Sequence, residues 1–430
     1  MSNHLKSIIM DSTKTMVKIG ILVVIQVLMI NCEKSQPYET PAFRSVSEKQ
    51  IAVNLEHPSG LSSNSYSQFA KGSKSSNITV LAQGPLFFVN RDEGRIDLTK
   101  SVNPMICQIE GTLDNLGLSS TSLAEFDIEN YFLDFNTSAS HGLNDSITRP
   151  IGLTLDNLVL GDGSVLVSSN SSDKIFKINL SGGIEVYLQN KELERITDII
   201  LGTNGKVYAA AVCKINSNDS SKVEVSKRVI SIDNGIINIE FVLPSDVNTH
   251  SWATGSDYYI KNWWRNAPYF EKLKVIENSE IGKKNFGAEF YVSDLLEDVI
   301  YKVDSKKNIS VLAEGLRHPS SLVVDAEGNI FYTNSPLWFE RGLTDIEYPT
   351  ELRVLNPETG QSTTIHRFDE KNIDEYTSSG TGMYVKYNKE TYVLPIGFNV
   401  TGILNESDNA LTFLFTNSHQ GTLKQLLVIK

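Results

Sequence analysis

Short stretches of alternating apolar and polar residues recur along the chain, separated by polar turns. Each copy has an aromatic or β-branched stretch, a turn rich in Gly, Asn, Asp or Ser, and a second stretch in which Ile, Val or Leu alternates with polar residues. A period of two bounded by turn residues predicts paired antiparallel strands. Six copies occur, over residues 86–98, 165–179, 206–233, 289–304, 329–356 and 412–429.

The spacing of the copies predicts how the hairpins assemble. Their first residues are 79, 41, 83, 40 and 83 positions apart, and a unit of about 40 residues is typical of one four-stranded propeller blade. A lone hairpin leaves its apolar face in water, whereas blades stacked in a ring bury it. We therefore predict an all-β protein, a β-propeller over residues 51–430. Six blades are favoured, seven or eight remain open, and an irregular pair of β-sandwiches is the alternative.

The N-terminus predicts an export signal. Three lysines precede the apolar stretch Ile19–Ile30, which as a helix of about 18 Å is too short for a bilayer core of about 30 Å. Cys32 follows at once, an arrangement that resembles a bacterial lipoprotein signal in which Cys32 is acylated. We expect a signal peptide over residues 1–31 and a tether over residues 32–50, with lipid anchoring in the periplasm, outer membrane or cell surface of a bacterium. Plain secretion, an uncleaved anchor and a chance apolar stretch remain open.

Charge narrows the choice of partners. The formal net charge is −12, and an acidic surface repels phosphate backbones, which argues against nucleic acid. The cysteines do not constrain the fold, since Cys107 and Cys213 are either a disulfide or two separate buried apolar residues.

One stretch carries a family resemblance. "HPSSLVVDAEGNIFYTNS" resembles the NHL repeat, with matches at Pro319, Leu322, Asp325, Gly328, Ile330, Tyr332 and Ser335. At the position of the repeat's second aspartate this chain has Asn334, Asn170 or Asp294 in three different copies. The resemblance implies a propeller but leaves the activity open, because one fold hosts many functions.

The chain also looks similar to the six-bladed gluconolactonase and senescence-marker-protein group, which implies a divalent metal in the central channel. At the positions that would supply ligands this chain has Ser320, Ile151, Ser59 and Thr197, and only Asp198 remains an acid. A hard cation needs several converging oxygens, so we expect no metal cofactor. Calcium bound through Asp198 or Asp294 remains open. The channel candidates are Asp198, Asp294, Asn334 and Asn170.

An aromatic segment interrupts the repeats between the third and fourth copies, at about residues 250–285. If exposed, its side chains would form a stacking platform for sugars or an anchor for a partner protein; a buried cap or a degenerate blade is the alternative. The binding candidates are Trp252, Tyr258, Tyr259, Trp263, Trp264 and Arg265.

Motifs for nucleophilic catalysis are missing from the sequence, which has no Gly-x-Ser-x-Gly elbow and no glycine-rich phosphate loop. His57 and His318 both precede Pro-Ser, which favours a shared structural role. Catalytic residues are therefore left unassigned.

The function favoured by the sequence is a binding module for a small molecule, carbohydrate or protein. The alternative is a metal-dependent lactonase, related hydrolase or lyase with its site at the central channel. Three or more oxygen or His ligands converging on the axis would favour the enzyme, and exposed aromatic residues would favour the binding module.

Overall fold

The structure is a computed structural model in which residues 1–39 and residues 40–430 form two separate units. Every strand belongs to the second unit. The structure describes residues 38–430 except 53–57, 64–78, 84–86, 91–94, 98–104, 113–114, 127–154, 170–172, 180, 191–195, 216–223, 234, 245–272, 296, 335–349, 369–374, 380–381, 388–389, 394–399, 408 and 418–421.

Six four-stranded antiparallel sheets dominate the described residues. Sheet 1 contains β2 (Pro58–Ser63), β3 (Thr79–Gln83), β6 (Met105–Thr112) and β7 (Asn115–Glu125). Sheet 2 contains β8 (Leu155–Val159), β9 (Val165–Ser169), β10 (Lys174–Ile178) and β11 (Ile184–Gln189). Sheet 3 contains β12 (Ile196–Leu201), β13 (Val207–Ile215), β14 (Glu224–Asp233) and β15 (Ile236–Val242).

The other three sheets follow in chain order. Sheet 4 contains β16 (Leu273–Glu277), β17 (Phe290–Asp294), β18 (Val299–Val303) and β19 (Ile309–Ala313). Sheet 5 contains β20 (Pro319–Val324), β21 (Ile330–Asn334), β22 (Glu351–Leu355) and β23 (Ser362–Arg367). Sheets 1 to 5 are each formed by one segment of the chain. Sheet 6 instead joins both ends of the second unit, β27 (Val400–Ser407), β28 (Ala410–Asn417), β29 (Thr422–Ile429) and β1 (Arg44–Ala52).

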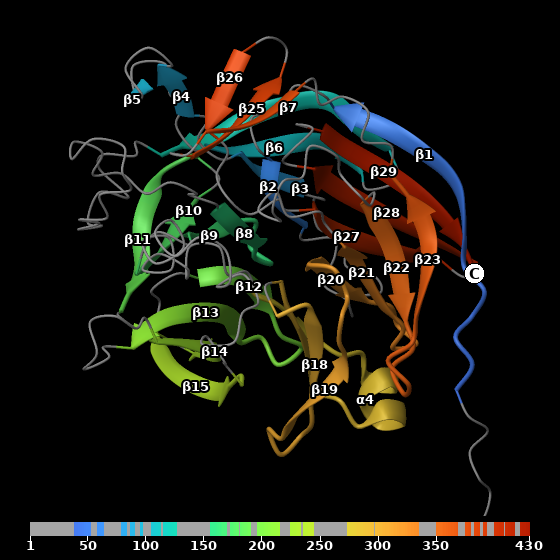
Figure 1. The fold of residues 1–430 in the computed structure, drawn as a ribbon. Helices are drawn as coiled ribbons and strands as arrows, with labels where there is room; N and C mark the ends of the chain where they lie inside the picture. The colour runs from blue at the N-terminus through green and yellow to red at the C-terminus, as the bar shows by residue number, and fades with distance from the viewer. Residues whose placement is uncertain are drawn as a thin grey trace, which may run out of the picture. The chain divides into compact units, whose positions relative to one another are not determined.

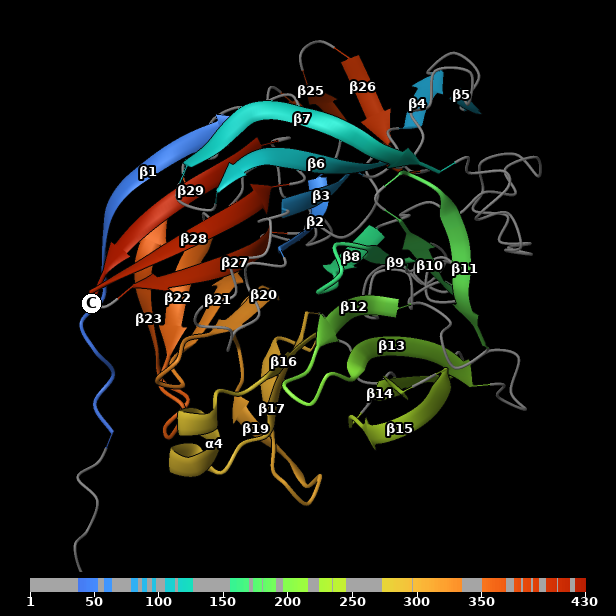
Figure 2. The ribbon, with the colours of Figure 1, turned by 180° about the vertical axis from the view of Figure 1, so that it is seen from behind.

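The first strand of each sheet lies toward the middle and connects the sheets into a ring. β8, β12 and β20 lie centrally in Figures 1 and 2, while β11, β15 and β23 lie at the periphery. β2 contacts β8, β8 contacts β12, β12 contacts β16, β16 contacts β20, β20 contacts β27, and β27 contacts β2. Each apolar sheet face is therefore covered by the next sheet. The prediction of a β-propeller is confirmed.

The ring is closed by β1, which pairs with β29 at the edge of sheet 6. Glu48 on β1 accepts hydrogen bonds from Lys424 on β29, at 2.9 Å, and from His366 on β23 of sheet 5, at 2.6 Å. The Phe43 ring meets the Phe331 ring edge-on, with the centroids 5.1 Å apart. The strand begins at Arg44, inside the stretch that the sequence predicts as a tether.

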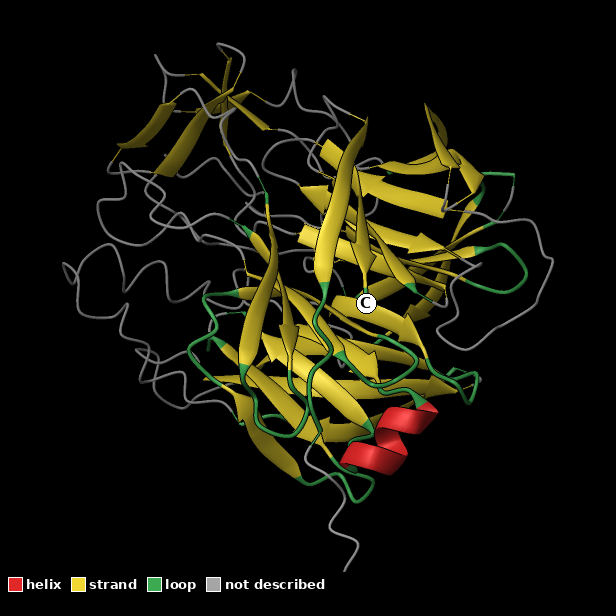
Figure 3. Ribbon diagram, turned by 90° about the vertical axis from the view of Figure 1, so that its right-hand side faces the viewer, coloured by secondary structure: helices red, strands yellow, loops and turns green. Residues whose placement is uncertain are grey.

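Five of the six sequence copies are the second and third strands of a blade. The copy at residues 86–98 is an exception, since β4 (Phe87–Asn90) and β5 (Arg95–Asp97) form a hairpin outside the ring. It joins a five-stranded sheet with β24 (Glu375–Ser379), β25 (Gly382–Tyr387) and β26 (Glu390–Val393), set apart from the blades in Figure 3. Alternation predicts a hairpin but not the sheet that the hairpin joins, which is why the blade assignment of this copy was wrong.

The two ends of the ring differ. We call the end at which β8, β12, β16 and β20 begin the connection end, and the opposite end the hairpin end. At the hairpin end a turn aspartate or asparagine accepts the backbone N–H two residues later, as at Asp162, Asn179, Asn204, Asp304, Asp325 and Asn356. Such side chains close short turns by replacing a backbone acceptor. Apart from the longer connections at residues 64–78 and 278–289, the turns at this end are compact and locally determined.

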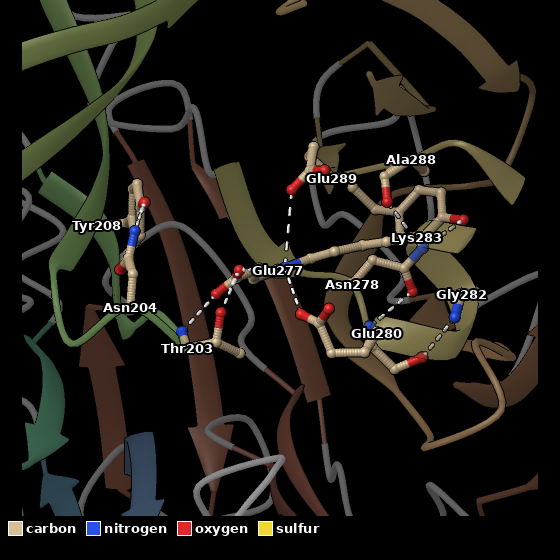
Figure 4. A network of polar contacts seen from close by, with 12 residues as sticks. Thr203, Asn204, Tyr208, Glu277, Asn278, Glu280, Gly282, Lys283, Ala288 and Glu289 are labelled. Carbon is tan, nitrogen blue, oxygen red and sulfur yellow. Dashed lines mark hydrogen bonds and ion pairs between the residues drawn. The ribbon is translucent and has the colours of Figure 1, made fainter. Parts of the chain in front are cut away.

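Helix α4 (Glu280–Phe286) lies between β16 and β17 at the hairpin end. Ser279 caps it by accepting from the Gly282 N–H, and Gly287 ends it with a positive φ of 63°. Glu277 accepts hydrogen bonds from the Lys283 ammonium, at 2.6 Å, and from the backbone N–H of Thr203 in sheet 3, at 2.6 Å (Figure 4). The network joins sheets 3 and 4 at this end. In the described part of the chain, no helix is long and apolar enough to cross a bilayer.

Candidate functional site

Three inner strands bring opposite charges together near the connection end. Asp156 is the second residue of β8, Asp198 the third of β12, and Lys274 the second of β16. The Lys274 ammonium donates to Asp198 at 2.6 Å and to Asp156 at 2.8 Å. Lys274 belongs to sheet 4, so it reaches past the inner strand of sheet 3 to contact sheet 2. We call these three residues the axial cluster.

Every carboxylate oxygen of the axial cluster accepts a hydrogen bond from the chain. Asp198 Oδ1 accepts from Lys274, and Asp198 Oδ2 accepts from the backbone N–H of Val275 at 2.7 Å. Asp156 Oδ2 accepts from Lys274, and Asp156 Oδ1 accepts from the backbone N–H of Asn157 at 3.0 Å. The charges are therefore both paired and hydrogen-bonded, as buried charges must be.

Burial sets the protonation chemistry of the axial cluster. The three residues are between 5% and 9% exposed. Burial raises the pKa of Asp198, the Lys274 ammonium lowers it, Asp156 raises it again, and the result is a pKa of about 7. Burial alone would lower the pKa of Lys274, but the two carboxylates outweigh it and hold that pKa above its usual range. Lys274 is thus a fixed cation, while Asp198 can take up or release a proton near neutral pH.

A second buried cation joins sheets 3 and 4 at the same end. Lys227, near the start of β14, is fully buried and donates to Asp294 at 2.7 Å and to Glu297 at 3.3 Å. Asp294, the last residue of β17, is also fully buried and accepts from the Glu297 N–H at 3.0 Å. Of the predicted channel candidates, Asp294 therefore belongs to a contact between a second and a third strand and not to the axial cluster.

The remaining channel candidates lie apart. Asn334, at the end of β21, accepts from the backbone N–H of Glu351 at 2.7 Å and so fixes the start of β22. Asn170 lies outside the described residues. Asp198 is thus the one predicted candidate in the axial cluster, and its partners Asp156 and Lys274 were missed.

The residues present do not fit the divalent metal that the resemblance implies. Thr197 and Ser320 stand where ligands are expected, but the Thr197 hydroxyl donates to the Leu273 carbonyl at 3.0 Å and Ser320 Oγ contacts Thr333 Oγ1 at 3.2 Å. The carboxylate oxygens of Asp198 and Asp156 are already engaged by Lys274 and backbone amides. Across the described ranges, no group of three His, Cys, Asp or Glu side chains is placed to hold a metal ion.

His318 is part of the blade-to-blade contact. It is 2% exposed, its Nδ1 lies 3.1 Å from the Leu295 carbonyl oxygen and 2.9 Å from Asp298 Oδ1, and its backbone N–H donates to Asp298. These contacts fix the start of β20 against the end of β17 and the start of β18. They agree with the structural role expected for this histidine; His57 lies outside the described residues.

The aromatic candidates Trp252, Tyr258, Tyr259, Trp263, Trp264 and Arg265 also lie outside the described residues, as does Cys32. Residues 273–285 of the predicted insertion are described, and they form β16 and most of α4. Cys107 is buried, while the side chain of Cys213 is outside the described set.

Two comparisons return no match, since no protein-family profile and no curated protein matches this chain. Solved structures do match the chain. A streptogramin B lyase matches at 10% identity and a TM-score of 0.40, over 89% of this chain and 97% of its own. XC5397 from Xanthomonas campestris, described as a gluconolactonase, matches at 9% identity and a TM-score of 0.44, over 91% of this chain and 96% of its own.

A third match is the extracellular domain of the hybrid two-component system protein BT4673 from Bacteroides thetaiotaomicron. It has 10% identity and a TM-score of 0.33, over 86% of this chain and 44% of its own. The expected resemblance to propeller enzymes is thus found among solved structures. These low identities and TM-scores carry no activity and no site residue over to this chain.

Proposed function

We propose that the protein is an exported, lipid-anchored binding module that holds its ligand at the connection end of the ring. The observation that carries this proposal is the strand topology. Most of the long connections start and finish at the end that also holds the axial cluster, whereas the hairpin end has two, residues 64–78 and the connection that contains α4, and otherwise short turns.

The strand order fixes where each connection begins and ends. Because the strands of a blade alternate in direction, the connections between blades and those between second and third strands all share the connection end. They include residues 127–154, 216–223, 243–272 and 335–350. They also include residues 84–104 and 368–399, which contain the strands of the five-stranded sheet. Binding residues are commonly carried on such long segments, positioned by a rigid scaffold.

The aromatic segment is the strongest contact candidate among these connections. Its aromatic residues belong to the connection between Val242, the last residue of β15, and Leu273, the first residue of β16. The backbone N–H of Leu243 donates to the Lys227 carbonyl, which fixes the start of the segment beside the Lys227 contact. Aromatic rings stack on the apolar faces of sugar rings and bury a large area at low entropic cost. We therefore propose a neutral oligosaccharide as the ligand class.

The binding proposal is tested by calorimetry against a panel of neutral oligosaccharides. Wild type should bind at least one of them, and the double variant Trp263→Ala/Trp264→Ala should lose at least about tenfold in affinity, the effect of removing an aromatic anchor. Tyr187→Ala is the matched control, because Tyr187 is a 38% exposed aromatic residue on the peripheral strand β11. No binding by wild type, or equal loss in the control, would contradict the proposal.

Export is tested separately. In a bacterial host, wild type should fractionate with membranes and carry an acylated Cys32, detectable by mass spectrometry of the N-terminal peptide. Cys32→Ala should leave the protein unacylated and not retained by an anchor. A soluble wild type with unmodified Cys32 would rule out the lipid anchor without bearing on the ligand.

One observation favours the alternative of an enzyme. The axial cluster pairs two carboxyl groups, and the pKa of Asp198 is raised to about 7, a value suited to a general acid or base at neutral pH. If the protein hydrolyses lactones or esters, Asp198→Asn should abolish that activity. The variant Trp263→Ala/Trp264→Ala should then reduce the hydrolysis rate much less than Asp198→Asn does.

A further inference from the structure

We infer that the Lys274 ammonium takes the place of a divalent cation at the centre of the ring, so that the chain supplies the positive charge of this site itself. This inference is independent of the proposed ligand. The metal that the sequence resemblance implies does not match the donor set at the axial cluster, which includes an ammonium group.

The geometry of the ammonium is that of a shared cation. Its nitrogen lies 2.6 Å from Asp198 and 2.8 Å from Asp156, carboxylates that belong to different sheets and are separated by 42 positions along the chain. A bridging divalent ion would contact the same oxygens, and carboxylates from two elements are a usual part of such sites. Lys274 therefore occupies the position in which a metal would join sheets 2 and 3.

The charge of the cluster is balanced by one ammonium together with one proton. Two ionised aspartates carry two negative charges and Lys274 carries one positive charge, which leaves one negative charge uncompensated among buried residues. Burial is the main cause of the raised pKa of Asp198 and the charge of Asp156 adds to it, so that a proton completes the neutralisation of the pair. With a divalent ion in place of the ammonium, both carboxylates would be compensated and ionised.

The inference predicts a gain of function. Shortening Lys274 removes the ammonium and leaves two buried carboxylates, which should then accept a calcium or manganese ion together with water. We expect Lys274→Ala to bind one calcium ion with a dissociation constant in the range of about 10⁻⁴ to 10⁻³ M, as in weak protein sites. Its melting temperature should rise by several degrees on saturation with calcium chloride or manganese chloride.

Three controls define the result. Wild type should show no calcium binding and no change in melting temperature with calcium chloride or with EDTA. The double variant Asp156→Asn/Lys274→Ala should fail to bind, because one carboxylate has been removed. Lys424→Ala is the matched single variant, since Lys424 is a buried lysine paired at 2.9 Å with the carboxylate of Glu48; it should lose stability without gaining a response to calcium.

Lys274→Ser provides a second variant, because its hydroxyl adds an oxygen ligand. Lys274→Ala and Lys274→Ser are both expressed and purified with and without calcium. Folding that requires calcium, or calcium binding by either variant, supports the inference. It is overturned if both variants ignore calcium and manganese, if neither folds even with calcium present, or if wild type binds a divalent ion at the axial cluster with loss of stability on chelation.

Discussion

At the residue scale, the most demanding feature is a lysine held between two aspartates where water is largely excluded. Ion pairs of this kind contribute little net stability compared with apolar residues of the same volume. Removing one partner, however, leaves an uncompensated buried charge and costs about 3–5 kcal/mol. The axial cluster therefore fixes how three sheets meet more than it strengthens any one of them.

Asp198 should make stability depend on pH in a recognisable direction. Its pKa is about 7 in the folded protein against an ordinary 3.8, so the folded state binds a proton more tightly than the unfolded chain. The resulting stabilisation is largest below pH 3.8 and is lost as the pH rises to about 7, at about 1.4 kcal/mol per pH unit at most.

Replacement by a neutral amide tests this sign. Asp198→Asn cannot ionise, so its melting temperature relative to wild type should increase steadily between pH 4 and pH 7 and then level off. Differential scanning calorimetry of both proteins over that range measures the effect, and the difference removes the contributions of carboxylates that do not interact with Asp198. Parallel profiles would show that Asp198 is ionised throughout.

Part of the axial cluster was predictable from the sequence. Asp198 was found because it stands within a recognisable strand-leading motif. Asp156 is a single charge inside the apolar run "LTLDNLVL", and a lone acid in such a run is a signal of a buried ion pair. Lys274 is one of three charged residues in "KLKVIEN", so nothing local distinguishes it from an exposed lysine. Nothing in the sequence, however, indicates that residues 156 and 274 meet, because that contact depends on the order of sheets around the ring.

At the element scale, the hairpins were predictable and the peripheral strands were less so. Second strands such as β9, β17 and β21 are buried along their whole length, and their apolar runs made five copies visible. Fourth strands such as β11 and β23 are mostly half-buried or exposed, so their alternation is weak. The strand β3 escaped detection as a second strand because its sequence resembles that of the peripheral strand β19.

A glycine substitution tests the packing of hairpins against α4. Gly328 has φ of 92°, and a Cβ there would lie 2.7 Å from Gly282 Cα and 2.8 Å from the Phe286 ring. Gly328→Ala should therefore lose about 3 kcal/mol of unfolding free energy, from backbone strain and overlap with the helix. Urea denaturation measures the loss.

Gly205 is the matched control because its φ is 76° and a Cβ there would meet nothing within 4 Å. Gly205→Ala should lose only about 1 kcal/mol, the cost of the backbone conformation. Equal losses in the two variants would mean that α4 does not pack against the turn at Gly328.

At the scale of the whole molecule, stability depends on closing the ring with β1. The strand supplies the fourth strand of sheet 6 and covers the edge of β29, and an uncovered edge strand is prone to pair with other chains. The sequence did not reveal this role, because β1 reads as a polar stretch: its residues are "RSVSEKQIA".

Truncation tests the closure. A chain that starts at residue 53 should unfold at a lower temperature and aggregate more readily than one that starts at residue 40, because it lacks β1, Phe43 and the Glu48 contacts. Calorimetry and light scattering compare the two. If both chains melt at the same temperature and remain monomeric, β1 does not close the ring.

The most direct test of the account is a double-mutant cycle between Asp156 and Lys274, which lie 118 positions apart on sheets that are not neighbours. Unfolding free energies of wild type, Asp156→Asn, Lys274→Met and the double variant give the coupling between the two side chains. A closed ring with a shared axial cluster predicts a coupling of about 1–3 kcal/mol, with none between Asp156 and Lys424. Additive effects at Asp156 and Lys274 would mean that the inner strands do not meet at a common axis.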